Sequence, residues 1–370
     1  MDKLKLFLVG GFLGSGKTTA IGQAAQYLLK DGKKVGVITN DQGVQQVDTR
    51  LIKGQHIPSG EVANGCFCCQ YNDLEKNLES LQQLEQTEFI FAESVGTCTD
   101  LAATVVNPLL SFNPGRYEIV LSIFADVRLL VKFLQDGKSV FFDTVSYIYE
   151  RQLIEADIIV VNKMDLLNEK QQESAKKLIR AAYRGKTILF QNSLSEAGIQ
   201  PWLAACAAVD NPALRPSLDI DYDIYGAGEA ELGWLDEEIG IVTDDGSAGK
   251  VAQIFCKKLY DRITADGYMI GHLKFLVDDG KQQKKISFTA LQGIDHADKV
   301  NMETDRVVVL INARVQVRPS LLQAIVNDVI IETELEANCK ITEYQLSAFQ
   351  PGYPRPTHRI LSRTKRIMYE

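Results

Sequence analysis

The stretch that decides the fold of this chain is Gly11-Phe-Leu-Gly-Ser-Gly16-Lys17-Thr18. It matches the phosphate-loop pattern G-x-x-x-x-G-K-[ST], it follows an apolar run from Leu4 to Val9 that is typical of a strand, and a helix is expected from Lys17 to Leu29. The glycines let backbone N–H groups close around a β-phosphate, and the helix N-terminus adds partial positive charge. A chance glycine-rich turn is the alternative, which the flanking strand and helix disfavour.

Each part of this loop has an expected contact with a nucleotide. Lys17 would bridge the β- and γ-phosphates, and the Thr18 hydroxyl would ligate Mg²⁺. The nucleotide-binding residues predicted here are Gly11, Gly14, Ser15, Gly16, Lys17, Thr18 and Thr19.

Outward from the loop, short apolar runs alternate with amphipathic segments of helical length as far as residue 208. The runs expected to be strands are Leu4 to Val9, Val35 to Thr39, Phe89 to Ala92, Ile119 to Phe124, Ile158 to Val161 and Thr187 to Phe190. Such alternation predicts βαβ units, and therefore an α/β fold: a P-loop NTPase domain over residues 1–208 with a mostly parallel, doubly wound sheet. Ligands of such a sheet bind beyond the carboxyl ends of its strands.

The rest of the chain has a different composition. Proline, glycine and aspartate accumulate over residues 209–249, which we expect to be a linker with one short strand around Ile239 to Val242. Helical and strand-like periodicities follow and predict a smaller C-terminal α+β domain over residues 250–370, which would bind a client or partner. Its proline-rich tail, Phe349 to Arg359, is expected to be extended.

Composition excludes several classes of protein. The 370 residues are 45% hydrophobic and 24% charged, which is typical of globular proteins, and the net charge of -8 argues against nucleic acid as a partner. No apolar stretch approaches the ~20 residues that cross a membrane, and the phosphate loop stands where a signal peptide would be cleaved. Three of the seven cysteines fall within four positions, too close for ordinary disulfides. A cytoplasmic, reducing location is expected.

A base-reading motif is predicted at Asn162-Lys163-Met164-Asp165, after the strand that ends at Val161. The Asp165 carboxylate would accept two hydrogen bonds from guanine, which adenine cannot supply, and an unpaired carboxylate would penalise ATP. Asn162 is expected to address the other edge of the base, and the Lys163 stem to pack along the ring. Helix capping by Asp165 is the alternative. Ser193, after the last strand of the domain, is expected to offer a further base contact.

Two carboxylates are expected to respond to the γ-phosphate. Glu93 ends a strand beside the phosphates, where it could hold Mg²⁺ through water, and the Gly96 N–H could meet the γ-phosphate. The segment from Asn40 to Gly43, with Asp48 further on, occupies the place of a first switch, and Asp41 is its expected Mg²⁺ ligand; a solvated turn is the alternative. The predicted catalytic set is Lys17, Thr18, Glu93 and Gly96.

Cys66, Cys68 and Cys69 form a C-x-C-C motif that predicts a transition-metal site. Thiolates select Zn²⁺, Cu⁺ or iron–sulfur clusters, and three of them leave a tetrahedral site open, which suits transient delivery. Thiol exchange, a redox role and plain burial are the alternatives. Cys98 could sense the same region, but a lone cysteine more often packs in a core.

Together these motifs resemble those of the CobW-like metallochaperone GTPases, relatives of the urease and hydrogenase nickel-insertion GTPases. The matching segments are Gly-Gly-Phe-Leu-Gly-Ser-Gly-Lys-Thr-Thr at 10–19, Asn-Gly-Cys-Phe-Cys-Cys at 64–69, Glu-Ser-Val-Gly at 93–96 and Asn-Lys-Met-Asp at 162–165. The resemblance covers about the first 205 residues and implies Mg-GTP binding, slow hydrolysis, and delivery of Zn²⁺ or Co²⁺ from the cysteine motif to a client. The chain departs from the family pattern at Asp41-Gln42, where a glutamate is usual, and at Ser94-Val95, so the metal and the hydrolysis rate stay open.

The C-terminal part resembles CobW-like proteins associated with corrinoid methyltransferase systems, which implies a corrinoid protein as a client. The leading hypothesis is therefore a GTPase that binds GTP or GDP, Mg²⁺, and Zn²⁺ or Co²⁺. It would deliver the metal to a client metalloprotein or assist the insertion of a cofactor into that client. One alternative is a nucleotide-dependent regulatory switch that acts on a corrinoid or methyltransferase partner without metal transfer. Another is a small-molecule kinase that uses ATP, which Asp165 opposes. A homodimer is left open.

Overall fold

The computed structural model describes residues 3–43, 47–136, 141–209, 214–289 and 300–362. The chain divides into two compact units, and each unit is built from segments that are distant in sequence. The first contains residues 1–42, 55–226 and 354–370, and the second contains residues 43–54 and 227–353.

The first unit is a seven-stranded sheet in the order β3-β2-β4-β1-β5-β6-β7, and every paired strand is parallel. Its strands are β1 Leu4–Gly10, β2 Val35–Asn40, β3 Ser59–Val62, β4 Phe89–Glu93, β5 Tyr117–Asp126, β6 Ile158–Asn162 and β7 Thr187–Phe190. Its helices are α1 Lys17–Lys30, α3 Tyr71–Leu84, η1 Ala102–Val106, α4 Asn107–Phe112, α5 Val127–Asp136, α6 Asp143–Glu155, η2 Met164–Leu166, α7 Glu169–Ala182 and α8 Glu196–Ala207. The predicted α/β P-loop architecture is confirmed.

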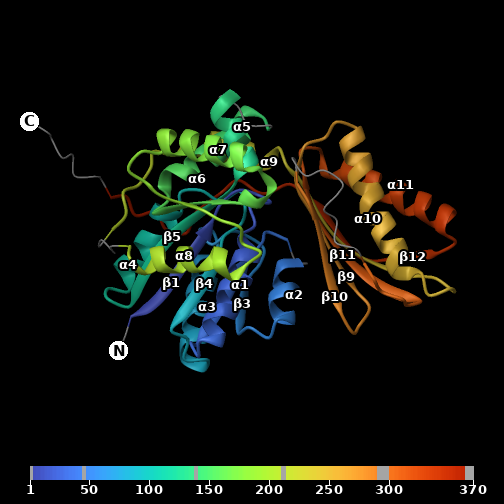
Figure 1. The fold of residues 1–370 in the computed structure, drawn as a ribbon, viewed down its shortest axis with the longest axis horizontal. Coiled ribbons are helices and arrows are strands. Elements are labelled where there is room, and N and C mark those ends of the chain that lie inside the picture. The colour runs from blue at the N-terminus through green and yellow to red at the C-terminus, as the bar shows by residue number, and fades with distance from the viewer. Residues whose placement is uncertain (1–2, 44–46, 137–140, 210–213, 290–299, 363–370) are drawn as a thin grey trace, which may run out of the picture. The chain divides into compact units, whose positions relative to one another are not determined.

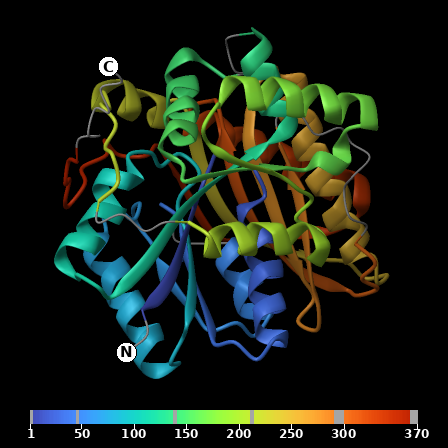
Figure 2. The ribbon, with the colours of Figure 1, turned by 60° about the vertical axis from the view of Figure 1, so that its left-hand side comes forward.

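Helices cover both faces of this sheet (Figure 2). Helices α1 and α8 pack together on one face, where the Trp202 ring of α8 contacts Phe91 and Phe124. The connection through α1 runs from β1 toward the β3 end of the sheet, whereas the connections through α3, α4 and α6 run toward the β7 end. Because such connections are right-handed, the latter three helices lie on the other face. The strands are buried from both sides, which explains why their sequences are continuous apolar runs.

Strand β1 lies between β4 and β5, and this order positions the site. Val9 is paired with Glu93, and Asp126 on β5 is paired with Asn162 on β6. Because all the strands are parallel, the segments that follow them meet at one edge of the sheet. The phosphate loop, Glu93 and Asn162 share this carboxyl edge.

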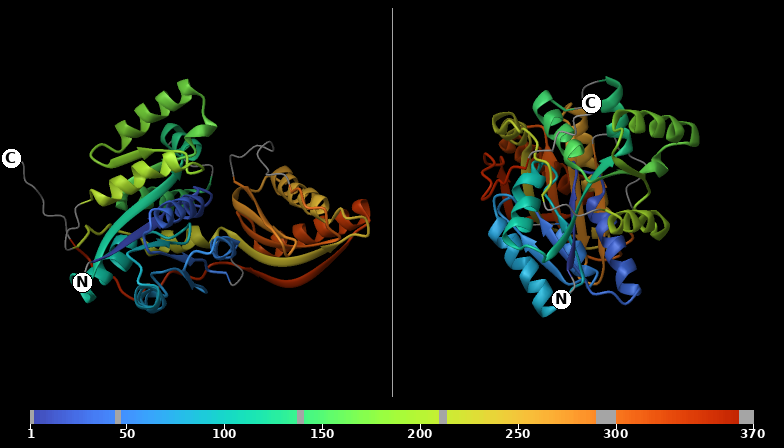
Figure 3. Two further views of the ribbon diagram at one scale, coloured as in Figure 1. Left: turned by 60° about the horizontal axis from the view of Figure 1, so that its bottom comes forward. Right: turned by 90° about the vertical axis from the view of Figure 1, so that its left-hand side faces the viewer.

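The second unit is a five-stranded antiparallel sheet in the order β10-β9-β11-β8-β12 (Figures 1 and 3). Its elements are α2 Val47–Gly54, β8 Gly233–Val242, α10 Ala248–Ala265, β9 Ile270–Asp278, β10 Gln283–Phe288, β11 Arg306–Val315, α11 Pro319–Ala337 and β12 Lys340–Phe349. Helices α10 and α11 cover one face, and Phe255 and Leu322 pack there against alternate strand residues such as Phe275 and Val309. A smaller α+β domain at this end of the chain is confirmed.

The predicted boundaries differ from the observed ones. Residues 209–249 are not a linker: they contain α9 Tyr222–Ala230, all ten residues of β8 and the start of α10. The division between the units falls within α9, residues 43–54 belong to the second unit, and residues 354–362 return to the first. Strands β3 and β12 were not predicted. The first is four residues long, and the second is largely exposed in its first half, where polar and charged residues interrupt the apolar pattern.

None of the helices in the described ranges is long and apolar enough to cross a membrane.

Candidate functional site

The phosphate loop joins β1 to α1, as predicted. Gly11 and Gly16 have φ values of 124° and 92°, which favour glycine. A side chain at Gly11 would collide with the carbonyl oxygen of Phe124, and one at Gly16 with the Asn162 amide. The Lys17 ammonium group donates to the carbonyl oxygens of Gly11, at 2.7 Å, and Phe12, at 3.4 Å. The loop therefore has the tight curvature and the placed cation that phosphate binding needs.

Thr18 and Glu93 are brought together beside this loop. The Thr18 hydroxyl donates to Glu93 Oε1 at 3.0 Å, and both side chains are buried. Gly96 lies against the loop, since a side chain there would meet Leu13. Asp41 follows β2, which is paired with β4, so its backbone belongs to the same edge of the sheet. A hydroxyl and a carboxylate at one point are oxygen ligands of the kind Mg²⁺ prefers, so the two side chains fit that ion.

The predicted base motif also lies at the carboxyl edge, where Asn162 makes hydrogen bonds that the motif alone does not predict. Its amide donates to the carbonyl oxygen of Ser15 at 2.9 Å, and its Oδ1 accepts hydrogen bonds from Ser193 N and Oγ at 3.1 and 2.8 Å. The side chain is buried and joins the phosphate loop to the segment after β7. The side chain therefore holds two parts of the site together, and its contact with a base stays a prediction.

Lys163 and Asp165 follow Asn162 directly. Lys163 has a left-handed backbone conformation, with φ 63°, and its ammonium group pairs with Asp126 at 3.1 Å. Burial lowers the pKa of Lys163, and the charge of Asp126 opposes that shift. Asp126 also pairs with Arg128 at 2.6 Å. Asp165 is exposed at the end of the sheet, where its carboxylate is accessible.

The three cysteines of the motif form a compact group. Their sulfur atoms all lie within 4.8 Å of one another, and the Cys66 sulfur is 2.8 Å from that of Cys68 and 3.3 Å from that of Cys69. The backbone turns as the sequence requires, because Cys69 N donates to the carbonyl oxygen of Cys66 at 3.0 Å. Cys66 and Cys68 are buried and Cys69 is partly exposed. Three convergent sulfur ligands with one accessible edge fit a soft transition-metal ion.

Asn40 fixes the position of this cysteine loop. Its amide donates to the carbonyl oxygens of Val62, at 2.9 Å, and Gly65, at 2.7 Å, and its Oδ1 accepts from Phe67 N at 3.0 Å. Asn40 is the last residue of β2 and directly precedes Asp41. The predicted first switch and the cysteine loop are therefore joined by one side chain. A polar residue that ends an apolar strand is the signal that could have indicated this role.

Two side chains of α6 hold the segment that follows Glu93. The Gln152 amide donates to the carbonyl oxygens of Gly96, at 3.0 Å, and Cys98, at 2.8 Å. Glu155 accepts from the Thr99 hydroxyl, at 3.3 Å, and from Ala102 N, at 3.1 Å, and burial raises its pKa to about 8. Sequence reasoning missed both residues. Gln152 continues the buried positions Val145, Ile148 and Tyr149 of α6, so a polar residue within an apolar stripe was the available signal.

The tail of the chain also reaches the cysteine loop. Thr357 N donates to the carbonyl oxygen of Cys68 at 2.8 Å, and its hydroxyl donates to that of Cys69 at 2.9 Å. Arg359 pairs with Asp100 at 2.7 Å. Residues 350–362 form neither helix nor strand, and the tail belongs to the nucleotide unit from Pro354 onward.

Asp48, expected near the first switch, lies elsewhere. It is part of α2, in the second unit, and its carboxylate pairs with Lys274 and, at 2.9 Å, with Lys285. Although burial opposes the shift, these two charges hold the pKa of Asp48 well below its usual range. The Asp48 side chain therefore stabilises the second unit by pairing α2 with two strands of its sheet.

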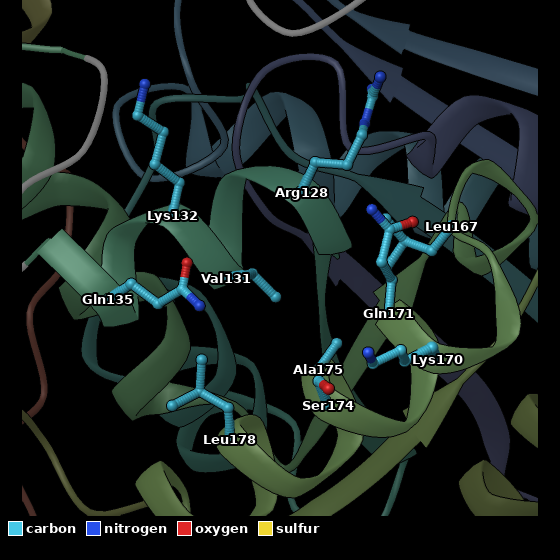
Figure 4. A pocket seen from close by; sticks show the side chains of 10 residues that line it. All are labelled: Arg128, Val131, Lys132, Gln135, Leu167, Lys170, Gln171, Ser174, Ala175 and Leu178. Atoms are coloured by element: carbon cyan, nitrogen blue, oxygen red, sulfur yellow. The ribbon is translucent and has the colours of Figure 1, made fainter.

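A hollow of about 660 Å³ lies between α5 and the segment from Leu167 to Leu178 (Figure 4). Arg128, Lys132 and Lys170 give it a basic rim, and Arg128 also reaches Asp126 of the base-side ion pair. Its lining comes from the two helices α5 and α7 and from Leu167, so the phosphate loop and the cysteine motif lie outside it.

Comparison with known proteins agrees with the motifs. The model of the CobW/HypB/UreG nucleotide-binding domain matches residues 5–190. Zinc chaperone YjiA of Escherichia coli is 30% identical over 184 residues, which are 46% of this chain and 53% of that protein. Zinc-regulated GTPase metalloprotein activator 1 of Dictyostelium discoideum is 26% identical over 219 residues, 48% of this chain and 44% of that protein. The chain thus spans about half the length of the curated relatives it matches.

Among solved structures, that of HypB from Helicobacter pylori in complex with nickel is 15% identical, with a TM-score of 0.42. The similarity covers 59% of this chain and 92% of that one.

Proposed function

The chain belongs to the CobW/HypB/UreG family, and on this premise we propose that it is a GTP-hydrolysing metallochaperone that binds a transition metal at Cys66, Cys68 and Cys69 and delivers it to a client protein. The observation that carries the proposal is the connection between two sites: Asn40 bonds to the cysteine loop and is the first residue of the predicted first switch. A nucleotide that moves this switch acts on the metal site through that side chain.

Guanine selectivity is assigned to Asp165. The exposed carboxylate, after the end of β6, is accessible to the N1–H and exocyclic amine of guanine, and Lys163 and Ser193 follow β6 and β7 at the same edge of the sheet. Asn162 contributes indirectly, by tying Ser193 to the phosphate loop.

Hydrolysis is assigned to the residues at the phosphate loop. Lys17 neutralises charge on the transferred phosphoryl group, and the backbone N–H groups of the loop orient that group. The Gly96 N–H would donate a hydrogen bond to the γ-phosphate, so the segment after Gly96 responds to its loss. Thr18 and Glu93 would hold Mg²⁺, which supplies charge neutralisation between the β- and γ-phosphates. Among the described residues no side chain is placed as an obvious base, so we expect slow turnover that a partner accelerates.

Zinc is the proposed cargo and cobalt the alternative. Soft thiolates select Zn²⁺, and two of the curated relatives are named for zinc. The proposed recipient is a metalloprotein; a corrinoid protein is the narrower expectation, which depends on the resemblance of the C-terminal part alone. The second unit is proposed to bind this partner.

The test is the rate at which Zn²⁺ leaves the protein for a colorimetric chelator, with GDP, GTP or a non-hydrolysable GTP analogue bound. We expect the rate to depend on the nucleotide in the wild type and not in Lys17→Ala, which should lose nucleotide binding. Equal rates in all nucleotide states would contradict the proposal and favour a regulatory switch whose cysteines do not carry cargo.

A further inference from the structure

The proline-rich tail connects two parts of the nucleotide unit that are distant in sequence. Three prolines within residues 351–356 restrict the backbone, which reduces the entropy that is lost when the following residues are ordered. We call residues 357–360 the strap. Its last residue is fixed at both backbone groups, because Ile360 N donates to the carbonyl oxygen of Ala103 at 2.8 Å and the Ile360 carbonyl oxygen accepts from the Asn107 amide at 3.0 Å.

One end of the strap binds the cysteine loop. Thr357 N donates to the carbonyl oxygen of Cys68 at 2.8 Å, and the Thr357 hydroxyl donates to that of Cys69 at 2.9 Å. The next residue, His358, lies edge-on against the ring of Tyr71, the first residue of α3, with 5.0 Å between the ring centroids. Because two of the three proposed metal ligands are held through their own carbonyl groups, a displacement of Thr357 moves these two relative to the third.

The other end of the strap is fixed to the segment that follows Glu93. Arg359 Nε donates to Asp100 Oδ2 at 2.7 Å, and the guanidinium group lies over the Tyr222 ring, 5.3 Å from its centroid. The Tyr222 hydroxyl donates to the same carboxylate oxygen at 2.8 Å. Asp100 is 1% exposed and has a left-handed backbone conformation, with φ 63°, that few residues other than glycine adopt. A buried carboxylate requires partners, so this ion pair holds the strap to the segment.

Asp100 lies on the segment that the nucleotide is proposed to move. Gly96, whose N–H is the proposed γ-phosphate contact, lies shortly before it. Gln152 of α6 donates to the carbonyl oxygens of Gly96, at 3.0 Å, and Cys98, at 2.8 Å, so these two peptide groups are held to one side chain and move together. A γ-phosphate that attracts the Gly96 N–H therefore displaces the residues up to Asp100 as well.

We propose that the strap transmits the nucleotide state to the metal site, an inference that rests on the function proposed above. Arg359 follows the displacement of Asp100, and Thr357 passes it to the carbonyl groups of the two cysteines. Thr357 and Arg359 are therefore positioning residues of the metal site, although neither is a metal ligand. This route is separate from that of Asn40, which bonds to other peptide groups of the cysteine loop.

The experiment measures the Zn²⁺ affinity of the reduced chain by chelator competition, with GDP or a non-hydrolysable GTP analogue bound, and the optical absorption of its Co²⁺ complex. The variants are Thr357→Val, which removes the hydroxyl and keeps the N–H bond, and Arg359→Ala. Thr357→Ser and Arg359→Lys are the conservative variants, which keep the hydroxyl and the charge. The matched control is Arg116→Ala, because Arg116 belongs to the same unit, pairs with Glu79 at 3.0 Å and is 27% exposed, against 31% for Arg359. Circular dichroism identifies the variants that fold.

We expect the Zn²⁺ affinities with the GTP analogue and with GDP to differ at least about 5-fold in the wild type and in Arg116→Ala, and less than about 2-fold in Arg359→Ala. Arg359→Lys should restore the difference. Thr357→Val should bind Zn²⁺ about 5-fold more weakly, as expected for one lost hydrogen bond, and Thr357→Ser should not. The sulfur-to-cobalt absorption should be the same in all these variants, since each keeps the three thiolates.

Two results would overturn the inference, and they differ in what they leave standing. If the wild type responds to the nucleotide and folded Arg359→Ala and Thr357→Val match Arg116→Ala in both nucleotide states, the strap is only structural and the proposed function stands. If the Zn²⁺ affinity of the wild type is the same with GDP and with the GTP analogue, the proposed function fails together with the strap.

Discussion

Replacing Asn40 by alanine should weaken metal binding without touching a metal ligand. The side chain makes three hydrogen bonds, to Val62, Gly65 and Phe67, and is 8% exposed. At about 1 kcal/mol for each bond, Asn40→Ala should cost about 3 kcal/mol of the free energy of unfolding of the nucleotide unit. Two of these bonds hold the cysteine loop, at Gly65 and Phe67. Without them the loop is less ordered in the metal-free variant, and metal binding must bear the cost of ordering it. We therefore expect Zn²⁺ affinity to fall about 10- to 100-fold, as when a group that supports metal ligands is removed.

The stability effect can be measured in this unit alone, because the chain has two tryptophans and only Trp202 lies in it. Urea unfolding would be followed by Trp202 fluorescence in a Trp234→Phe background, and Zn²⁺ affinity by chelator competition. The matched control is Asn77→Ala, which removes hydrogen bonds to the carbonyl oxygens of Glu61, at 3.2 Å, and Asp73, at 2.8 Å. It should destabilise the unit to a similar extent and leave Zn²⁺ affinity unchanged. Equal losses of affinity in the two variants would refute the argument that Asn40 positions the cysteine loop.

Three further perturbations address the other parts of the molecule. Asp165→Ala should weaken GTP binding at least about 100-fold, because guanine loses two hydrogen bonds to a carboxylate worth about 1.5–3 kcal/mol each. ATP binding should be tighter in a nucleotide titration, because the carboxylate that adenine leaves unpaired is gone. Burial raises the pKa of Glu155 to about 8, from 4.5, so the folded protein favours the protonated carboxyl group. The contribution of this group to the free energy of unfolding is complete below pH 4.5 and is lost as the pH rises toward 8. The wild type should therefore lose about 3 kcal/mol of unfolding free energy between pH 5 and pH 7 through this group, and unfolding of Glu155→Gln across this range should lack that component. Asp48→Asn leaves Lys274 and Lys285 without their shared carboxylate and should destabilise the second unit by about 1–3 kcal/mol. Unfolding of this unit would be followed by Trp234 fluorescence. A change in GTP affinity of more than about 2-fold would show that Asp48 belongs to the nucleotide site.

The sheet of the nucleotide unit was predictable because its strands are buried on both faces. Continuous apolar runs mark six of its seven strands, and a single motif marks the loop after β1. The same reasoning finds only the end of β8, Ile239 to Val242, because Asp236, Glu237 and Glu238 interrupt the apolar pattern before it. Asp236 is accommodated in the strand because it pairs with Arg314 at 2.7 Å, and that partner lies on another strand, which local periodicity cannot reveal.

The site was predicted as separate motifs, and its connections were not. Two sequence patterns indicate their ligands directly: the phosphate loop, with Lys17 and Thr18, and the C-x-C-C motif. Asn40, Gln152 and Thr357 act through backbone carbonyl groups, so their roles depend on which loops the fold brings to them. Asn162 shows the limit of a motif, because the pattern does not reveal the hydrogen bonds that connect this side chain to Ser15 and Ser193.

The central claim is that the metal site and the nucleotide site are coupled, and the most direct measurement is GTP and ATP hydrolysis by metal-free protein, alone and with one equivalent of Zn²⁺ or Co²⁺. A variant in which Cys66, Cys68 and Cys69 are all serine is measured beside it. We expect GTP to be preferred and metal to change the rate only when the cysteines are intact, because coupling between two binding sites is reciprocal. A GTP hydrolysis rate that is the same with and without metal in the intact protein would contradict the account.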